Sequence, residues 1–148
     1  MKKLWTLAVL CAASTLPATA FSDAKDAVDY RKAAFQMIRH NTGDIGEMLQ
    51  GKVTFEAKRV QERADALAAL APLPWAAFAT KGTEQGGGDA KAEIWTNMSD
   101  FMAKADQFTA DAKALQVAAQ SGDQAKIKAA FGQFRSNCKA CHDQYKAD

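Results

Sequence analysis

The sequence has few of the residues from which most chemical sites are built. Its 148 residues include only two histidines and three cysteines. Runs of β-branched residues are scarce and no strand pattern is evident, which argues against a fold based on a sheet. No feature supports turnover of an organic substrate, so the chain is not predicted to be an enzyme.

The net charge is zero once the N-terminal residues are set aside. The chain has 19 Lys and Arg residues and 17 Asp and Glu residues. Lys2 and Lys3 are the only charged residues among the first twenty, so residues 21–148 carry 17 charges of each sign. Proteins that bind nucleic acid or anionic membranes usually carry a basic excess, so neither partner is predicted.

The first twenty residues have the pattern of an export signal. Behind the two lysines, residues 4–16 are apolar and Ala18-Thr19-Ala20 forms a small-residue cleavage site. The apolar run is shorter than the about 20 residues that a membrane span needs. We predict that residues 1–20, which include Cys11, are a cleaved signal peptide and that residues 21–148 form a single domain.

The strongest chemical signal is a Cys-x-x-Cys-His motif, Cys138-Lys139-Ala140-Cys141-His142. Positions i, i+3 and i+4 share one face of a helix, so Cys138, Cys141 and His142 all face one ligand. The spacing is typical of a haem c attachment site, in which both thiols bond to the porphyrin and the histidine binds iron. The motif predicts one covalent haem c.

Zinc, a disulfide or coincidence are the weaker interpretations of this motif. A structural zinc site normally needs four nitrogen or sulfur ligands, and the motif groups only three. A redox Cys-x-x-Cys is expected near a βαβ pattern, and none precedes it. Because bacteria attach haem c outside the cytoplasm, the motif and the export signal together predict a protein of the bacterial periplasm.

Four helices are predicted from the spacing of apolar residues in a segment rich in helix formers. We expect them to start at Ser22 or Asp23, at Thr54, near Asp89 and after Asp123. Short first and third turns favour an all-α fold, an up-down-up-down antiparallel four-helix bundle. The expected core stripes are Ala24, Val28, Arg31, Phe35, Ile38, Thr42, Ile45 and Leu49; Phe55, Val60, Ala64, Leu67 and Leu70; Ile94, Met98, Phe101, Ala105, Phe108, Ala112, Leu115 and Ala119; and Ile127, Phe131, Phe134, Cys138, Cys141 and Tyr145.

The second connection, from Ala71 to Gly88, is much longer than the other two. Loops of this length in compact domains are commonly functional or disordered. In the predicted topology it lies at the end of the bundle where Cys138 and Cys141 occupy core positions, so the porphyrin replaces side-chain packing there. Trp75 and Phe78 either cover an edge of the macrocycle or only anchor the loop.

The function depends on the sixth position of the iron, opposite the expected axial ligand His142. The other histidine, His40, lies about 140° around the helix from Phe35 and therefore off the core stripe. Met37 is also off the stripe, and Met48 is far along the helix. Phe35 is on the stripe at the haem end and cannot bind iron. The sequence thus predicts five-coordinate iron with an apolar, crowded distal face that admits small uncharged diatomic molecules.

Two basic residues are candidates for the surroundings of the haem. Arg31 lies one turn from Phe35 on the same stripe. Because a buried arginine is rare unless it is paired, a haem propionate is its natural partner; the alternative is a side chain that extends to solvent. Lys146, four residues after His142, either adds positive charge on the proximal side or belongs to a solvated tail.

Four patches of the sequence resemble the cytochrome c′ family: Cys138-Lys139-Ala140-Cys141-His142-Asp143, Asp29-Tyr30-Arg31-Lys32, Leu73-Pro74-Trp75-Ala76-Ala77-Phe78 and Glu93-Ile94-Trp95. The resemblance spans essentially all of residues 21–148. It implies a high-spin haem c with His142 as the axial ligand and an open sixth site lined by Phe35. It also implies binding of NO and CO, a homodimer joined through the first two helices, and haem contacts from Arg31, Lys32, Thr83 and Glu84.

Two departures from this family pattern concern the haem pocket. Where the family often has leucine, Phe35 is bulkier and is expected to hinder ligand approach or tilt the haem. Where some members have arginine, Lys146 lacks the planar fork of that side chain. A low-spin branch has methionine where Phe35 stands, and its absence here argues against a dedicated six-coordinate electron carrier.

The sequence therefore predicts a gas-binding cytochrome that binds or detoxifies NO and has some capability for electron transfer. The alternatives are a six-coordinate electron-transfer cytochrome and a haem-free helical scaffold. No physiological redox partner is predicted.

Overall fold

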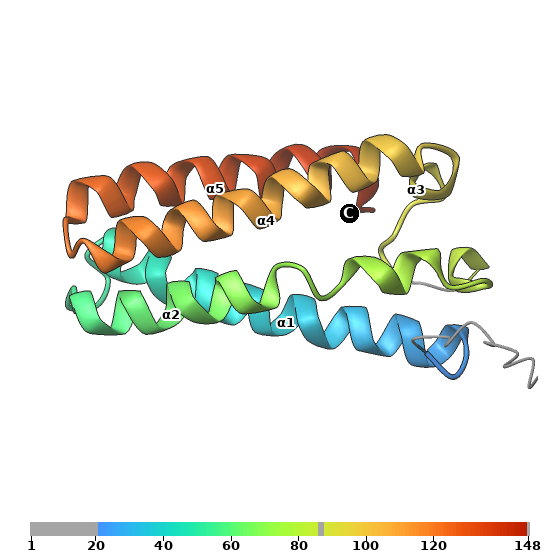
Figure 1. The fold of residues 1–148 in the computed structure, drawn as a ribbon, viewed down its shortest axis with the longest axis horizontal. Helices are drawn as coiled ribbons and strands as arrows, with labels where there is room; N and C mark the ends of the chain where they lie inside the picture. The colour runs from blue at the N-terminus through green and yellow to red at the C-terminus, as the bar shows by residue number, and fades with distance from the viewer. Residues whose placement is uncertain (1–20, 86–87, 148) are drawn as a thin grey trace, which may run out of the picture.

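The computed structural model describes residues 21–85 and 88–147, and these are mostly helical (Figure 1). The long helices are α1 (Ala24–Leu49), α2 (Ala57–Leu70), α4 (Met98–Gln120) and α5 (Gln124–Tyr145). Between α2 and α4 lie two 3₁₀ helices, η1 (Trp75–Ala79) and η2 (Thr83–Gln85), and the one-turn helix α3 (Glu93–Thr96). The predicted signal peptide with Cys11, and Gly86 and Gly87 of the long loop, lie outside the described residues.

The long helices form the predicted up-down-up-down bundle. In Figure 1, α1 lies beside α2 and α4 lies beside α5, and α2 also packs against α4. The start of α1, the end of α5 and the long connection share one end of the bundle, as predicted; there the Lys91 N–H donates to the Tyr145 carbonyl at 3.0 Å. None of the helices in the described ranges is long and apolar enough to cross a membrane.

Two helix starts agree with the prediction. The carboxylate of Asp23 accepts a hydrogen bond from the Asp26 N–H at 2.8 Å and caps α1. Asp123 caps α5 in the same way, because its Oδ1 accepts from the N–H groups of Ala125 and Lys126 at 2.9 and 3.1 Å.

The prediction that Thr54 caps the second helix is wrong. Helix α2 begins at Ala57, with Glu56 at the N-cap and no hydrogen bond from a capping side chain. Phe55 and Val60, on either side of the first turn, both pack in the core. This pair of apolar residues determines how the chain enters the helix.

The predicted start of the third helix near Asp89 is also wrong. The chain becomes helical at Glu93, and Asn97 separates α3 from α4. Ala90 instead forms an isolated antiparallel bridge with Lys146, and the Ala147 N–H donates to the Asp89 carbonyl at 2.7 Å. This pairing joins segments far apart in the sequence, so local periodicity does not predict it.

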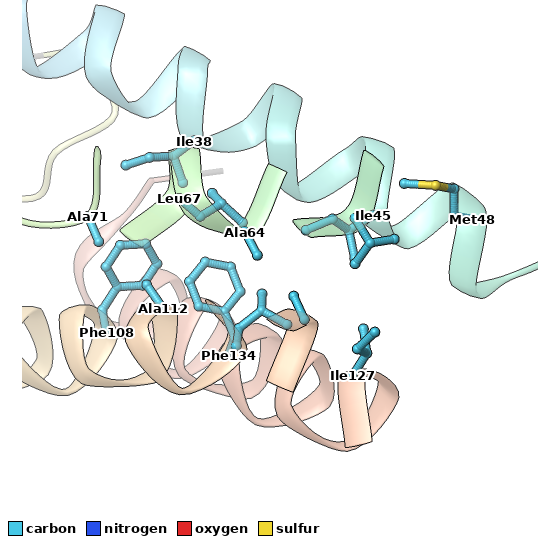
Figure 2. Packing of buried hydrophobic residues seen from close by; sticks show 13 residues of the cluster. Ile38, Ile45, Met48, Ala64, Leu67, Ala71, Phe108, Ala112, Ile127 and Phe134 are labelled. Atoms are coloured by element: carbon cyan, nitrogen blue, oxygen red, sulfur yellow. The ribbon is translucent and has the colours of Figure 1, made fainter. Parts of the chain in front are cut away.

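The main core lies between the two helix pairs (Figure 2). It is built from the predicted stripes, and its buried residues include Ile38, Ile45, Leu67, Phe108, Leu115, Ile127 and Phe134. Helix α1 continues through Gly43 and Gly46. A Cβ atom on Gly46 would lie 3.4 Å from Cζ of Phe131, so the Phe131 ring of α5 packs against this glycine.

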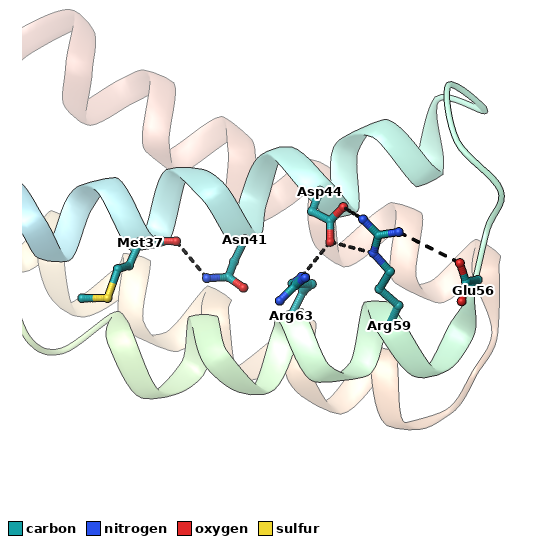
Figure 3. Close-up of polar contacts among 6 residues, drawn as sticks. All are labelled: Met37, Asn41, Asp44, Glu56, Arg59 and Arg63. Atoms are coloured by element: carbon teal, nitrogen blue, oxygen red, sulfur yellow. Dashed lines mark hydrogen bonds and ion pairs between the residues drawn. The ribbon is translucent and has the colours of Figure 1, made fainter.

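A buried carboxylate joins α1 to α2 (Figure 3). Asp44 is only 8% exposed. It accepts hydrogen bonds from Nε of Arg63 at 2.6 Å, from Nε of Arg59 at 2.9 Å and from Nη2 of Arg59. These hydrogen bonds, first those from Arg59, hold the pKa of Asp44 below its usual value.

Candidate haem site

A second group of apolar residues fills the end of the bundle where α1 begins and α5 ends. Its buried members are Phe78, Ile94, Phe101 and Tyr145, and Phe35, Trp75, Ala90, Trp95, Met98, Met102 and Cys141 pack against them. We call this group the aromatic cluster. Trp75 lies edge-on to Phe35 and Phe101, with ring centroids 5.5 and 5.8 Å apart. Aromatic and aliphatic side chains therefore dominate this end of the bundle.

The aromatic residues of the long connection anchor it, which is one of their two predicted roles. Nε1 of Trp75 donates to the Ala71 carbonyl at 2.6 Å. Nε1 of Trp95 donates to the Phe78 carbonyl at 2.9 Å. Since both indole N–H groups are satisfied by backbone carbonyls, these side chains hold η1 against the bundle.

The two cysteines of the motif lie where the main core and the aromatic cluster meet. Cys138 packs against the main core, and Cys141 packs against the aromatic cluster. Both are free and half-buried. Burial raises the pKa of Cys138 to about 11 and also raises the pKa of Cys141. Two neutral thiols one helical turn apart therefore face the interior, as attachment to a porphyrin requires.

His142 follows in the last turn of α5 and is exposed. Burial and then the charge of Lys146 lower the pKa of its imidazole. The imidazole is therefore neutral at pH 7, which is the form that binds a metal. In the described part of the chain, no group of three or more His, Cys, Asp or Glu side chains is arranged to hold a metal ion.

Arg31 lies inside the bundle, 2% exposed, so the alternative in which it extends to solvent is wrong. Its guanidinium carbon is 4.2 Å from the centroid of the Phe78 ring and 5.7 Å from that of Trp95. These contacts favour the cation, while burial lowers the pKa of the group. The spacing of core residues in the sequence predicted that Arg31 faces the core. Phe78 of η1 and Trp95 of α3 lie against its guanidinium.

Thr83 and Glu84 hold the turn of the long connection. The hydroxyl of Thr83, which is fully buried, donates to the carbonyls of Thr80 at 2.7 Å and Phe78 at 3.2 Å. The carboxylate of Glu84 accepts from the Gly82 N–H at 2.9 Å, and Gly82 has a φ of 90°, which favours glycine. The single hydroxyl proton of Thr83 is thus shared between backbone carbonyls.

The two lysines predicted near the haem are exposed, at the rim of the aromatic cluster. Cε of Lys32 lies 2.9 Å from where a Cβ atom on Gly88 would stand. Lys146 lies 3.2 Å from the carboxylate of Asp89 and still lowers the pKa of His142. Lys146 therefore has both features that the sequence offered as alternatives, a position in the tail and a charge felt by the imidazole.

The other ligand candidates considered from the sequence lie away from the aromatic cluster. His40 is exposed, Met37 is 47% exposed, and Met48 is buried in the main core. Sequence reasoning missed Met98 and Met102 as possible ligands, although both pack against the aromatic cluster. Met98 belongs to the predicted third stripe, which was a sufficient signal to include it.

An inward-facing thiol pair followed by a neutral histidine, at the aromatic end of an antiparallel four-helix bundle, defines the class of helical-bundle c-type cytochromes. Comparison with known proteins specifies the family. The family model for cytochrome c′ matches residues 26–146. The cytochrome c′ of Rubrivivax gelatinosus is 40% identical over 127 residues, which cover 85% of this chain and 98% of that protein.

Solved structures agree with this match. Cytochrome c′ from Shewanella frigidimarina superposes with a TM-score of 0.83 at 45% identity, covering 86% of this chain and 99% of that one. A nitric oxide complex of a variant from Alcaligenes xylosoxidans has a TM-score of 0.79 at 37% identity and covers 86% and 99%. The chain belongs to the cytochrome c′ family, and its cofactor is haem c.

Proposed function

We propose that the protein is a periplasmic cytochrome with a five-coordinate, high-spin haem that binds NO and CO, and that it binds or detoxifies NO with some capability for electron transfer. The main support is the composition of the aromatic cluster on the side of α1 and η1. The side chains there are Phe35, Trp75 and Phe78, and a phenyl ring offers no atom to bind iron. The complex of a relative with nitric oxide supports the choice of gas.

The chain's own residues divide the work of holding the group. Haem c, when bound, supplies an iron that takes up a diatomic gas or exchanges one electron. Cys138 and Cys141 attach it, and His142 offers a neutral imidazole. Arg31, a cation deep in the cluster, suits the carboxylates of a porphyrin. Phe35 would limit the space for a ligand of the iron.

The residues at the rim contribute less directly. Lys32, which lies beside Gly88, would add positive charge for the carboxylates of a bound porphyrin. Thr83 and Glu84 act by shaping the turn, because their polar groups bond to the backbone. The charge of Lys146 adds to burial, the larger cause, in lowering the pKa of the His142 imidazole. A contact of Thr83 or Glu84 with a propionate therefore goes through backbone or aliphatic atoms.

The proposed homodimer through α1 and α2 rests on exposed apolar side chains of α1. Tyr30 is 39% exposed and Met37 is 47% exposed. Sedimentation velocity checks the dimer, which Met37→Glu should dissociate. Periplasmic location rests on the export signal, and cell fractionation with N-terminal sequencing tests whether the protein begins at Phe21.

One observation favours the electron-transfer alternative. Met98 and Met102 pack against the aromatic cluster, and a thioether sulfur is a common axial ligand in electron-transfer cytochromes. Both residues lie on α4, which packs directly on α5. A thioether from either residue at the sixth position would make the haem six-coordinate and low-spin, which the spectra below distinguish from the proposed five-coordinate state.

Absorption spectra of the exported protein, oxidised and reduced, before and after addition of CO, test the proposal. A high-spin reduced spectrum that shifts with CO is the expected result. A low-spin spectrum indifferent to CO would support the alternative, and the double variant Met98→Leu, Met102→Leu would then become high-spin. His40→Ala serves as the control, because His40 is exposed on α1. A denaturing gel that shows no covalently bound haem would support the haem-free scaffold instead.

A further inference from the structure

The turn of α5 that carries the axial ligand is at the end of the helix. His142 lies in the last turn, which ends at Tyr145. The last four carbonyls of a helix lack partners within it, and such turns fray unless other groups bind them. Attachment through Cys138 and Cys141 restrains the helix before His142. Other contacts are needed to restrain the last turn, from His142 to Tyr145.

A side-chain hydrogen bond ties this turn to α4. The hydroxyl of Tyr145 donates to Oδ2 of Asp100 at 2.5 Å and accepts from Nε2 of Gln144 at 3.0 Å. Tyr145 is 2% exposed, and its ring lies edge-on to Phe101 at 5.3 Å between centroids. Both Asp100 and Phe101 belong to the start of α4. Nζ of Lys104 lies 3.6 Å from the same carboxylate.

The protonation states make this hydrogen bond a strong one. Burial and the bond to Asp100 raise the pKa of Tyr145 to about 12. The bond from Tyr145 is the main cause that lowers the pKa of Asp100. At neutral pH a protonated phenol therefore donates to an ionised carboxylate, which is a charge-assisted hydrogen bond.

Backbone hydrogen bonds hold the same turn from another direction. The Tyr145 carbonyl accepts from the Lys91 N–H at 3.0 Å, and the Asp89 carbonyl accepts from the Ala147 N–H at 2.7 Å. The side chains of Lys146 and Asp89 add an ion pair at 3.2 Å. The end of α5 is thus held by residues 89–91 as well as by the start of α4.

We propose that Tyr145 and Asp100 are positioning residues for His142, because their hydrogen bond holds the last turn of α5 in the orientation in which the imidazole binds the haem iron. The proposal rests on the proposed function, in which His142 is the axial ligand. It adds a role for Asp100, a residue of α4 outside the attachment motif.

Two conservative variants of the holoprotein test this role. Tyr145→Phe keeps the ring that packs on Phe101 and removes the hydroxyl, and Asp100→Asn keeps the shape and removes the charge. Asp106→Asn is the matched control, because Asp106 is an exposed carboxylate on the same helix. Amide hydrogen exchange reports on the turn, and resonance Raman spectroscopy of the ferrous protein reports on the iron–histidine stretching vibration.

We expect Tyr145→Phe to speed amide exchange at Lys91, Lys146 and Ala147 by about tenfold, the factor that one hydrogen bond to a charged group supplies. Asp100→Asn should speed it by a smaller factor, because the amide oxygen of asparagine still accepts from the Tyr145 hydroxyl. The iron–histidine vibration should shift or broaden in both variants and stay unchanged in Asp106→Asn. The double variant should add little to Tyr145→Phe alone, because Asp100→Asn only weakens the bond that Tyr145→Phe already removes.

Faster exchange with an unchanged vibration would overturn the proposal, since the bond would then serve stability alone. Unchanged exchange would overturn it as well. If Tyr145→Phe fails to attach haem, Asp100→Asn decides by the same two measurements. A wild-type protein that lacks a covalent haem or an iron–histidine vibration would instead refute the proposed function, which the wild-type sample shows before any variant is compared.

Discussion

Phe35 is the residue whose replacement most directly tests how gas reaches the iron. Its half-buried ring meets Trp75 edge-on, with centroids 5.5 Å apart and planes at 76°, and meets Phe78 at 6.4 Å and 66°. If this ring lines the sixth position, a diatomic molecule enters only when the ring moves away from these two neighbours. Phe35→Ala removes that step.

The energy of the two ring contacts gives the size of the effect. Each aromatic pair contributes about 0.5–1.5 kcal/mol, so moving the ring away from both costs about 1–3 kcal/mol. A barrier lower by that amount corresponds to an association rate faster by about fivefold to 160-fold. Phe35→Leu keeps part of the bulk and should give a smaller increase.

Flash photolysis of the ferrous CO complex measures this association rate. Phe131→Ala is the control, because Phe131 is also half-buried but packs near Gly46 in the main core. It should lower stability and leave the rate unchanged. The reasoning would be refuted by a Phe35→Ala protein that carries a full complement of haem and binds CO at the wild-type rate.

Three further outcomes concern stability. Asp44→Asn should lower the urea midpoint at pH 7; because the pKa of Asp44 is lowered in the folded state, its contribution is present above the unfolded value of about 3.9 and disappears in stronger acid. A difference that persists there would contradict this account. Gly43→Ala should stabilise by about 1 kcal/mol in thermal unfolding, since nothing lies within 4 Å of the added Cβ, whereas Gly46→Leu should destabilise. Phe134→Ala should cost about 3–5 kcal/mol in urea, because Phe134 is fully buried.

The local features of the chain were predictable because they depend on residues a few positions apart. The spacing of Cys138, Cys141 and His142 specifies their common helix face. Periodicity predicted buried positions such as Ile45, Phe101 and Leu115, and all three are buried. Asp23 and Asp123 were predictable as helix starts because a capping carboxylate binds N–H groups within its own turn.

Contacts between distant segments were not predictable in the same way. Thr54 looked like a cap, but packing of Phe55 and Val60 moved the start of α2 to Ala57. The stretch near Asp89 looked helical, but it pairs with the end of α5. In both cases a weak local preference gave way to tertiary contacts.

The sequence by itself determined the class of cofactor, the four helices and the end of the bundle that holds the site, because periodicity and a short motif carry that information. Only the tertiary structure decided the depth of Arg31, the engagement of the Thr83 hydroxyl and the bond between Tyr145 and Asp100. Each of these depends on which side chains meet across the bundle. These contacts depend on how whole helices and the long connection pack to bury apolar surface. No short stretch of sequence specifies that packing.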